Sequence, residues 1–284
     1  MDHGTATSPW PVWLRTPVPY RTFGALVSAG FRRYSTYQQA TVAGIATNTV
    51  FGFLNCYVLL AVAAGNRGSA AGYRPDQLAT FVWITQGLLA TVGIWGDGLL
   101  AQRIRTGEVV SDLLRPVHPV ITYLGNDLGR AGYAALTRFT VPLLVGACVF
   151  DLRAPTRAAT YPLFLLSTLL GVLLSFACRY LVNAAAFWLL DARGPQVAWN
   201  LAATLLGGLY FPLRFLPGPV LAVIWLGTPF PSLMQGPVDI VVERVTLAGQ
   251  LGILAVQVAW VVLMFWLCRT VQRVAERKLV VQGG

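Results

Sequence analysis

The sequence predicts an all-α integral membrane protein, and its composition and its apolar runs support this prediction. Hydrophobic residues make up 56% of the 284 residues, charged residues only 11%, and the mean hydropathy is +0.61. Soluble domains carry about 25% charged residues. Apolar runs of about 20 residues also recur, long enough for a helix to cross a hydrocarbon core roughly 30 Å thick. Helices satisfy their own backbone hydrogen bonds, so they are the expected spanning elements.

The first expected element is an amphipathic helix within residues 1–40, a segment that we expect to be cytoplasmic. From Phe23 to Tyr34, apolar or small residues recur at helical spacing, and arginines fall elsewhere on the wheel. Such a helix can lie in the membrane interface with its arginines near lipid phosphates. The alternative is an ordinary helix on a soluble surface.

Six transmembrane helices are expected within the transmembrane domain, residues 41–268. The expected spans are 41–64, 78–96, 132–150, 158–190, 196–213 and 245–268. Before the last span, at about 215–238, five prolines deny the chain a continuous helix. We expect one or two short, half-inserted (re-entrant) helices there. Residues 269–284 are expected to form a cytoplasmic tail.

The basic residues predict the orientation, because Lys and Arg accumulate on the cytoplasmic side of a membrane. With both termini inside, thirteen basic residues fall on the inner segments and five on the outer loops. Topology therefore explains the net charge of +10. Nucleic-acid binding is the competing interpretation of a basic chain, but the charges are dispersed instead of forming one patch, so no nucleic-acid partner is expected.

A search for catalytic and metal-binding patterns gives no candidate. The chain has no GxxxxGK[ST] phosphate loop, and its single lysine, Lys278, lies in the tail. His3 and His118 lack the companions of a zinc motif, and the four cysteines are spread one per span. No catalytic residue, metal or cofactor is expected in this chain.

Polar residues within the spans are expensive in lipid and tend to face a bundle interior or a water-filled path. Asn48 and Asn55 fall seven residues apart in the first span, on a face with small residues. Trp83 and Gln86 begin a similar stripe in the second span. Either these faces pack helix against helix, or they line a path for a substrate.

Three charged residues lie at or near membrane depth. Arg138 and Arg179 fall in the third and fourth spans, and Asp97 ends the second. A buried ion pair between Asp97 and one of the arginines is the expected arrangement, and a gating role is the alternative.

A charged island, at about 104–116, separates the second and third spans and is expected in the cytoplasm. The segment from Glu108 to Leu114 is predicted to form a short helix that ends before Pro116. Its apolar residues, Val109, Val110, Leu113 and Leu114, cluster on one side of this helix. Its charged residues, Glu108, Asp112 and Arg115, lie off that side. Such a ridge suits a groove on another protein, although a helix resting on the membrane would look the same.

The segment Ile104-Arg105-Thr106-Gly107-Glu108, followed by Asp112-Leu113-Leu114-Arg115-Pro116-Val117, resembles the permease subunit of type-2 ABC exporters, in the bacterial branch that includes drug and viologen exporters. The layout of interfacial helix, six spans and proline-broken stretch resembles that family as well. The resemblance implies that two permeases pair, as a homodimer or heterodimer, in the bacterial plasma membrane. Each would recruit a separate cytoplasmic ATPase, which holds ATP and Mg, through a coupling helix.

The resemblance also implies roles for residues. The implied ATPase-coupling residues are Arg105, Gly107, Glu108, Asp112, Leu113, Leu114 and Arg115. The first, second and fifth spans of the family border the translocation path, so the path candidates are Asn48, Asn55, Trp83, Gln86 and Asn200.

The leading hypothesis is an exporter of a drug-like, amphipathic or lipid-like substrate that works by alternating access. The rival hypotheses are an integral membrane enzyme that modifies lipids, and a channel or scaffold that needs no ATP.

Overall fold

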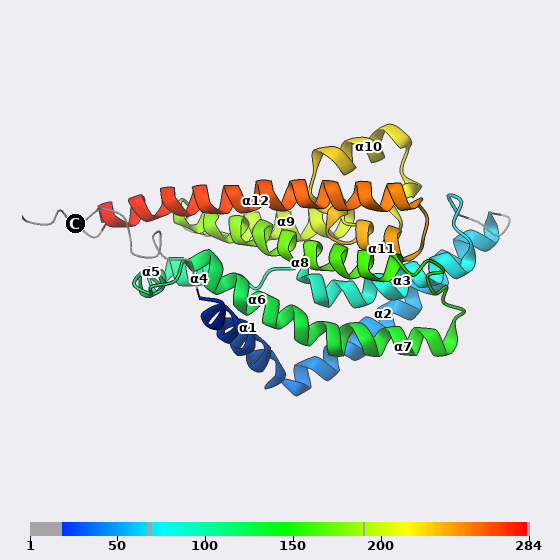
Figure 1. Cartoon of the computed structure of the whole chain (residues 1–284), viewed down its shortest axis with the longest axis horizontal. Helices are drawn as coiled ribbons and strands as arrows, with labels where there is room; N and C mark the ends of the chain where they lie inside the picture. Colours follow the sequence, from blue (N-terminus) through cyan, green and yellow to red (C-terminus); the bar gives the residue numbers. More distant parts are fainter. Residues whose placement is uncertain (1–18, 67–69, 190, 283–284) are drawn as a thin grey trace, which may run out of the picture.

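The computed structural model of the chain describes residues 19–66, 70–189 and 191–282, in which helices joined by short turns and loops make up the fold (Figure 1). The only β-type pairing within them is an isolated bridge between Ala70 and Tyr73. The first 18 residues of the expected N-terminal segment and the last two of the tail lie outside the described residues. In chain order the elements are α1 (Tyr20–Ser35), α2 (Gln38–Gly65), α3 (Pro75–Leu88), η2 (Leu89–Gly93), α4 (Leu99–Arg105), α5 (Val109–Leu113), α6 (Pro119–Ala134), η3 (Ala135–Phe139), α7 (Thr140–Val149), α8 (Thr160–Ala184), η4 (Ala185–Phe187), α9 (Arg193–Leu206), η5 (Leu213–Phe215), α10 (Gly218–Gly227), η6 (Phe230–Ser232), α11 (Gln235–Val241) and α12 (Leu247–Gln282).

Within the described residues, four helices are long and apolar enough to cross a membrane. They are Gln38–Gly65, Pro119–Val149, Thr160–Phe187 and Leu247–Glu276. They match the expected first, third, fourth and sixth spans, and they confirm the all-α membrane class. The expected second and fifth spans correspond to the shorter helices α3 with η2 and α9, so a count of six spans stays a prediction.

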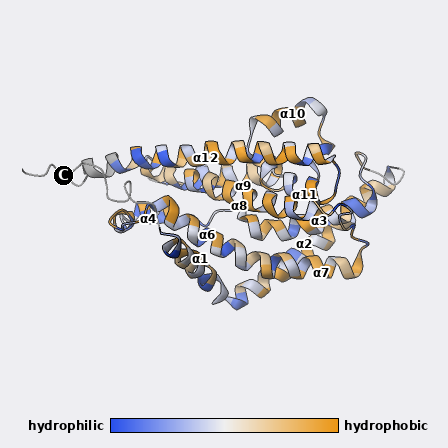
Figure 2. Ribbon diagram, viewed as in Figure 1, coloured by the Kyte–Doolittle hydropathy of each residue, from blue (hydrophilic) through white to orange (hydrophobic). Residues whose placement is uncertain are grey.

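Two helices extend beyond the boundaries expected from the sequence. The third begins at Pro119 instead of near Gly132, and a π-helical turn, η3, joins its two parts. The last helix, α12, continues past Arg269 to Gln282. Figure 2 shows α12 changing from mainly hydrophobic over its first part to mainly hydrophilic toward its C-terminal end. The expected boundary at 268 is therefore a change of composition and not the end of a helix.

The proline-rich stretch forms two short helices, α10 and α11, separated by an irregular turn with η6. This agrees with the short helices expected from the prolines. None of the residues of α10 is buried, whereas every residue of α11 is. The depth of this proline-rich stretch in a membrane, and hence its re-entrant character, stays a prediction.

Helix α8 is the centre of the bundle. Half of its most apolar 18-residue window is buried inside the molecule, against 22% or less for the other three spanning helices. It runs beside α12 (Figure 1), and polar groups join the two helices. Ser167 donates to Gln257 at 2.8 Å, and Tyr180 donates to Gln272 at 2.6 Å. Such interhelical bonds replace part of the hydrophobic driving force that helices lack in lipid.

The amphipathic helix expected near the N-terminus is present as α1, and it packs closely along α6 through glycines. A β-carbon added to Gly30 would lie 2.2 Å from the backbone of Asn126, and one added to Gly129 would lie 2.1 Å from the carbonyl of Val27. Only glycine permits two helix backbones to approach this closely. The apolar side of α1 therefore has a partner within the chain.

Glu243 organises the loop before α12. Its carboxylate accepts hydrogen bonds from the Thr156 hydroxyl at 2.6 Å, the Arg157 backbone at 2.9 Å and the Thr160 hydroxyl at 2.8 Å. Burial alone would raise its pKa, but these bonds outweigh burial and lower the pKa from 4.5 to about 2. The bonds also hold Glu243 at a φ of +54°, a region that favours glycine.

We predict that Gly129→Ala separates α1 from α6. The added methyl group meets backbone atoms of Val27 and Phe31, which cannot turn aside, and overpacking of this kind costs about 1–3 kcal/mol. Thermal unfolding in detergent and cross-linking between cysteines placed on α1 and α6 measure the effect. Gly132→Ala is the control, since the nearest atom there is 3.9 Å away; equal loss in both variants would contradict the packing argument.

We predict that Glu243→Gln lowers stability at pH 7 by roughly 3 kcal/mol, the free energy that corresponds to the lowered pKa. Because the folded pKa is depressed, this contribution is complete above pH 4.5 and is lost as the pH falls toward 2. The unfolding temperatures of the variant and the wild type should therefore converge across that window. Asp191→Asn, which breaks an exposed ion pair with Arg193, should change stability by less than about 1 kcal/mol.

Candidate coupling loop and membrane polar cluster

The charged island folds as two short helices joined by a tight turn. Helix α4 ends at Arg105, and Gly107 then adopts a φ of +78°, which only glycine tolerates without strain. Its backbone N–H donates to the carbonyl of Ile104 at 3.2 Å and so satisfies a carbonyl at the end of α4. The chain reverses there and enters α5 at Val109. We call residues 99–117 the α4–α5 loop.

Asp112 fastens this loop to the bundle. Its carboxylate accepts two hydrogen bonds from Arg103 of α4, at 2.9 and 3.0 Å, and a third from the Tyr123 hydroxyl of α6 at 2.8 Å. The Asp112 side chain is 8% exposed. A bidentate guanidinium–carboxylate pair is among the stronger and more directional polar contacts. The loop is therefore tied to α6 and is not a free tether.

The apolar ridge expected on α5 is divided between two faces. Val109 is 1% exposed and packs inward with Asp112, whereas Val110 is 48% and Leu114 82% exposed. Leu113 is half-buried. Asp112 was expected with Glu108 and Arg115, away from the apolar residues, but the helix turns it inward toward Arg103 and Tyr123. The exposed charged residues around the ridge are Arg105, Glu108 and Arg115.

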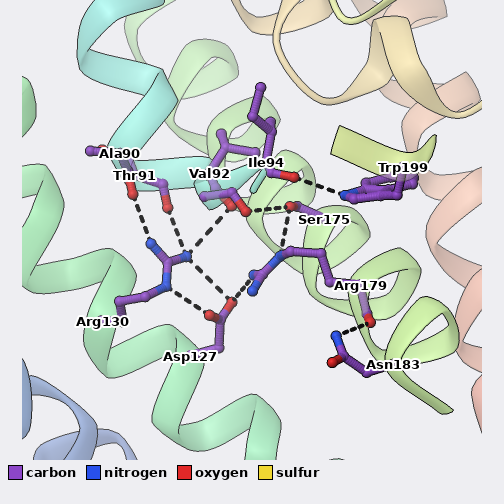
Figure 3. Close-up of polar contacts among 11 residues, drawn as sticks. Ala90, Thr91, Val92, Ile94, Asp127, Arg130, Ser175, Arg179, Asn183 and Trp199 are labelled. Atoms are coloured by element: carbon purple, nitrogen blue, oxygen red, sulfur yellow. Dashed lines mark hydrogen bonds and ion pairs between the residues drawn. The ribbon is translucent and has the colours of Figure 1, made fainter. Parts of the chain in front are cut away.

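A buried polar cluster holds the end of α3. After Leu88 the chain makes a π-helical turn, η2, and Gly93 then leaves the helix with a φ of +63°. The carbonyls freed by this break find side-chain donors (Figure 3). Arg130 donates to Ala90 at 2.7 Å and to Thr91 at 3.2 Å, and Ser175 donates to Gly93 at 3.1 Å. Unsatisfied backbone groups are costly in lipid, so these donors permit the helix to end there.

Asp127 joins two arginines within the same cluster. It pairs with Arg130 at 2.7 Å, three residues along α6, and with Arg179 of α8 at 2.8 Å. All three side chains are between 10% and 13% exposed. The expected ion pair of Asp97 with either Arg138 or Arg179 is not formed among the described residues. Asp97 instead accepts a hydrogen bond from the backbone of Leu99 at 3.2 Å and so begins α4.

Asn183 connects the cluster to the α4–α5 loop. Its side-chain oxygen accepts hydrogen bonds from the backbone of Ala101 in α4 at 3.3 Å and from Gln196 of α9 at 3.1 Å. Its amide donates to the carbonyl of Arg179 one turn earlier at 2.8 Å. Helices α4, α8 and α9 thereby meet at one side chain.

The expected path candidates divide between packing positions and partly open positions. Asn48 is buried and donates to the carbonyl of Gln86 at 3.3 Å, joining α2 to α3. Trp83 is fully buried, and a β-carbon at Gly146 would lie only 2.3 Å from its ring. Their contacts are those of helix packing.

Of the other three path candidates, Gln86 is buried, whereas Asn55 and Asn200 are half-buried. Asn55 lies on α2 and Asn200 on α9. The side-chain oxygen of Asn200 is buried without a hydrogen-bond partner among the described residues. No contact brings the five candidates together around one cavity, so their role in a path stays a prediction.

Arg138 lies apart from the ion pairs. It sits in η3, and its guanidinium lies against the backbone of α2 at Gly44, where an added β-carbon would collide with it. Its Nε is buried and has no hydrogen-bond partner within the described ranges. The predicted ion pair of Arg138 is not formed there.

The sequence interpretation missed four residues of these two sites: Arg103, Tyr123, Asp127 and Arg130. Asp127 and Arg130 have the i, i+3 spacing of a helical ion pair, but the third span was expected to begin after them. Arg103 and Asp112 are nine residues apart, and only the turn at Gly107 brings them together. That spacing carries no helical signal.

We predict that Asp127→Asn destabilises the protein by about 3–5 kcal/mol, because it leaves two buried guanidinium groups without their shared carboxylate. Thermal unfolding in detergent measures the loss. Asp76→Asn is the matched control, since Asp76 pairs with an Arg74 side chain that is 59% exposed, and it should cost less than about 1 kcal/mol. A similar, small effect of both substitutions would contradict the central role of Asp127.

Comparison with known proteins agrees with this architecture. The family model described as ABC-2 family transporter protein matches residues 51–283, which include the α4–α5 loop and the polar cluster. No curated protein and no solved structure matches the chain. The match confirms the resemblance to a type-2 permease, and with it a multi-pass membrane transport subunit whose family works with an ABC ATPase. The chain belongs to the ABC-2 transporter family.

Proposed function

We propose that this chain is the permease of an ATP-driven exporter and that the α4–α5 loop receives the motion of a separate ATPase. The observation that carries the proposal is the combination, in one short loop, of an exposed apolar pair and a rigid internal anchor. Val110 and Leu114 face outward, while Asp112 ties the same helix to α4 and α6. A docking surface that is to transmit force needs both properties.

The surface of α5 fits a protein partner. Val110 and Leu114 are four residues apart and so lie on one side of the helix. Short amphipathic helices dock in grooves through such i, i+4 anchors, and charged groups at the rim favour one partner and register over others. Glu108, Arg105 and Arg115 supply that rim.

The position of the loop supports the same role. In Figure 1, α4 and α5 lie at the end of the molecule toward which the C-terminal end of α12 points. That end of α12 carries Arg269 and Arg273. Since basic residues mark the cytoplasmic side, we place this end, both termini and the ATPase in the cytoplasm of a bacterial cell.

The complex that we propose contains two ATPases, which hold ATP and Mg, and two permeases, as copies or as paralogues. The exposed apolar surface of α2, which includes Val50, Leu54 and Val58, offers area for a second permease or for lipid. Closure of the ATPases would move the α4–α5 loops and open the path outward. A drug-like, amphipathic or lipid-like cargo suits the largely apolar helices that would surround it.

We predict that Leu114→Asp reduces recovery of the ATPase with the permease about tenfold or more and abolishes ATP-dependent transport in proteoliposomes. The loss of one buried anchor at an interface commonly costs more than 1–2 kcal/mol. Thermal stability of the isolated permease should be unchanged, because this side chain is already 82% exposed.

Val274→Asp provides the matched control. Val274 is 49% exposed on α12, near the same end of the molecule but outside the α4–α5 loop. This variant should assemble and transport like the wild type. Normal assembly and coupled transport by the Leu114→Asp variant would overturn the proposed docking surface, whereas transport without any ATPase would overturn the exporter itself.

A further inference from the structure

We propose that a cavity beside Arg138 binds a phosphodiester, a singly charged phosphate group bearing two ester links. The cavity lies between the two π-helical turns η2 and η3 and has a volume of about 230 Å³. Drug-sized ligands occupy pockets of roughly 300–1,000 Å³, so this space suits a small anionic group better than a whole drug. Its polar lining comes from Tyr34, Asn48, Asp97, Arg130, Arg138 and Arg179.

The charges around the cavity do not balance. Arg130, Arg138 and Arg179 contribute three positive charges. Asp97 in the lining and Asp127, which binds two of the arginines, contribute two negative charges. One positive charge therefore remains, and a phosphodiester carries the single negative charge that would neutralise it.

Arg138 is the arginine that remains available. The guanidinium groups of Arg130 and Arg179 are occupied by Asp127, by backbone carbonyls and by Ser175. No hydrogen bond or ion pair holds Arg138 within residues 19–66, 70–189 and 191–282. A planar guanidinium matches two phosphate oxygens in a bidentate arrangement, and the hydroxyl of Tyr34 in the same lining can donate as well.

The depth of Arg138 makes an uncompensated charge there costly. It lies 11 residues before the end of α7 at Val149, which is about 16 Å of helix and close to half of a hydrocarbon core roughly 30 Å thick. Charged side chains at such depth pair with one another or face a functional cavity. Among the described residues, the cavity is what Arg138 faces.

The backbone is shaped around this side chain. Gly44 leaves the space that the guanidinium fills, because a β-carbon there would lie 1.7 Å from its terminal nitrogen. Arg138 itself sits in a π-helical turn, a local insertion that occurs frequently at functional sites. Both features accommodate the Arg138 side chain inside the bundle, next to the cavity.

The test measures binding and does not depend on transport or on an ATPase. The chain, purified in dodecyl maltoside, a detergent without phosphate, is titrated with phosphatidylglycerol, a lipid phosphodiester, and separately with soluble dimethyl phosphate. Native mass spectrometry counts retained lipid, and thermal unfolding reports stabilisation by either probe. We expect one tightly retained phosphatidylglycerol per chain and a higher unfolding temperature in the wild type.

Arg138→Gln should weaken this binding roughly tenfold or more. Without added anion its unfolding temperature should equal or exceed that of the wild type, because the substitution removes an unpaired charge. Gly44→Ala displaces the guanidinium without changing the charge and should weaken binding in the same direction. Arg32→Gln is the matched control, since it removes one exposed arginine from α1 and should retain the lipid.

Stabilisation by dimethyl phosphate alone, dependent on Arg138, would support the same site with a soluble phosphodiester as its occupant. Equal loss of lipid in the Arg32→Gln and Arg138→Gln variants would mean diffuse surface attraction and would overturn the proposal. So would a wild-type protein that neither probe stabilises.

Discussion

The bundle depends on one arrangement of charges, the carboxylate of Asp127 held between Arg130 and Arg179. The helical run of α3 and η2 stops inside the protein, at Gly93, and its last carbonyls need hydrogen-bond donors there. Arg130 satisfies two of them, and it can do so as a buried cation because Asp127 compensates its charge. Arg179 pairs with the same carboxylate from α8 and so connects the end of α3 to the central helix. Without this cluster the early end of α3 would leave polar backbone groups unpaired at membrane depth.

Glycines determine where the helices can approach one another, and each has a different neighbour. Gly129 accommodates the backbone of α1, Gly146 accommodates the ring of Trp83, and Gly44 accommodates the guanidinium of Arg138. In lipid, close packing has to replace much of the hydrophobic contribution to helix association. Each of these glycines is therefore required at its position, because a larger residue would collide with the group packed against it.

The sequence predicted well the features that depend on composition and on local pattern. The four long apolar helices, the short helix at Val109–Leu113 and the broken stretch after residue 215 all follow from hydropathy, proline and glycine. It predicted poorly the features that depend on which side chains meet across the fold. Asp97 and Asp127 are equally acidic in the sequence, and only packing of α6 on α8 selects Asp127 as the partner of Arg179. For the same reason the sequence did not predict that Tyr123 and Arg103 hold Asp112 inward.

Helix α6 contributes residues to both polar sites, the α4–α5 loop and the buried polar cluster, and so connects them. Tyr123 binds Asp112 of the α4–α5 loop, and Asp127, one turn further along the same face, binds the arginines of the cluster. A displacement of the loop would therefore be passed to α6 as a rigid element instead of being absorbed by flexible chain. Helix α6 also packs against α1 through its glycines, and its Arg130 donates to the carbonyl of Ala90 after the end of α3. Helix α6 thus contacts the loop, the ion-pair cluster and α1, whereas Arg138 takes no part in the ion pairs of the described residues.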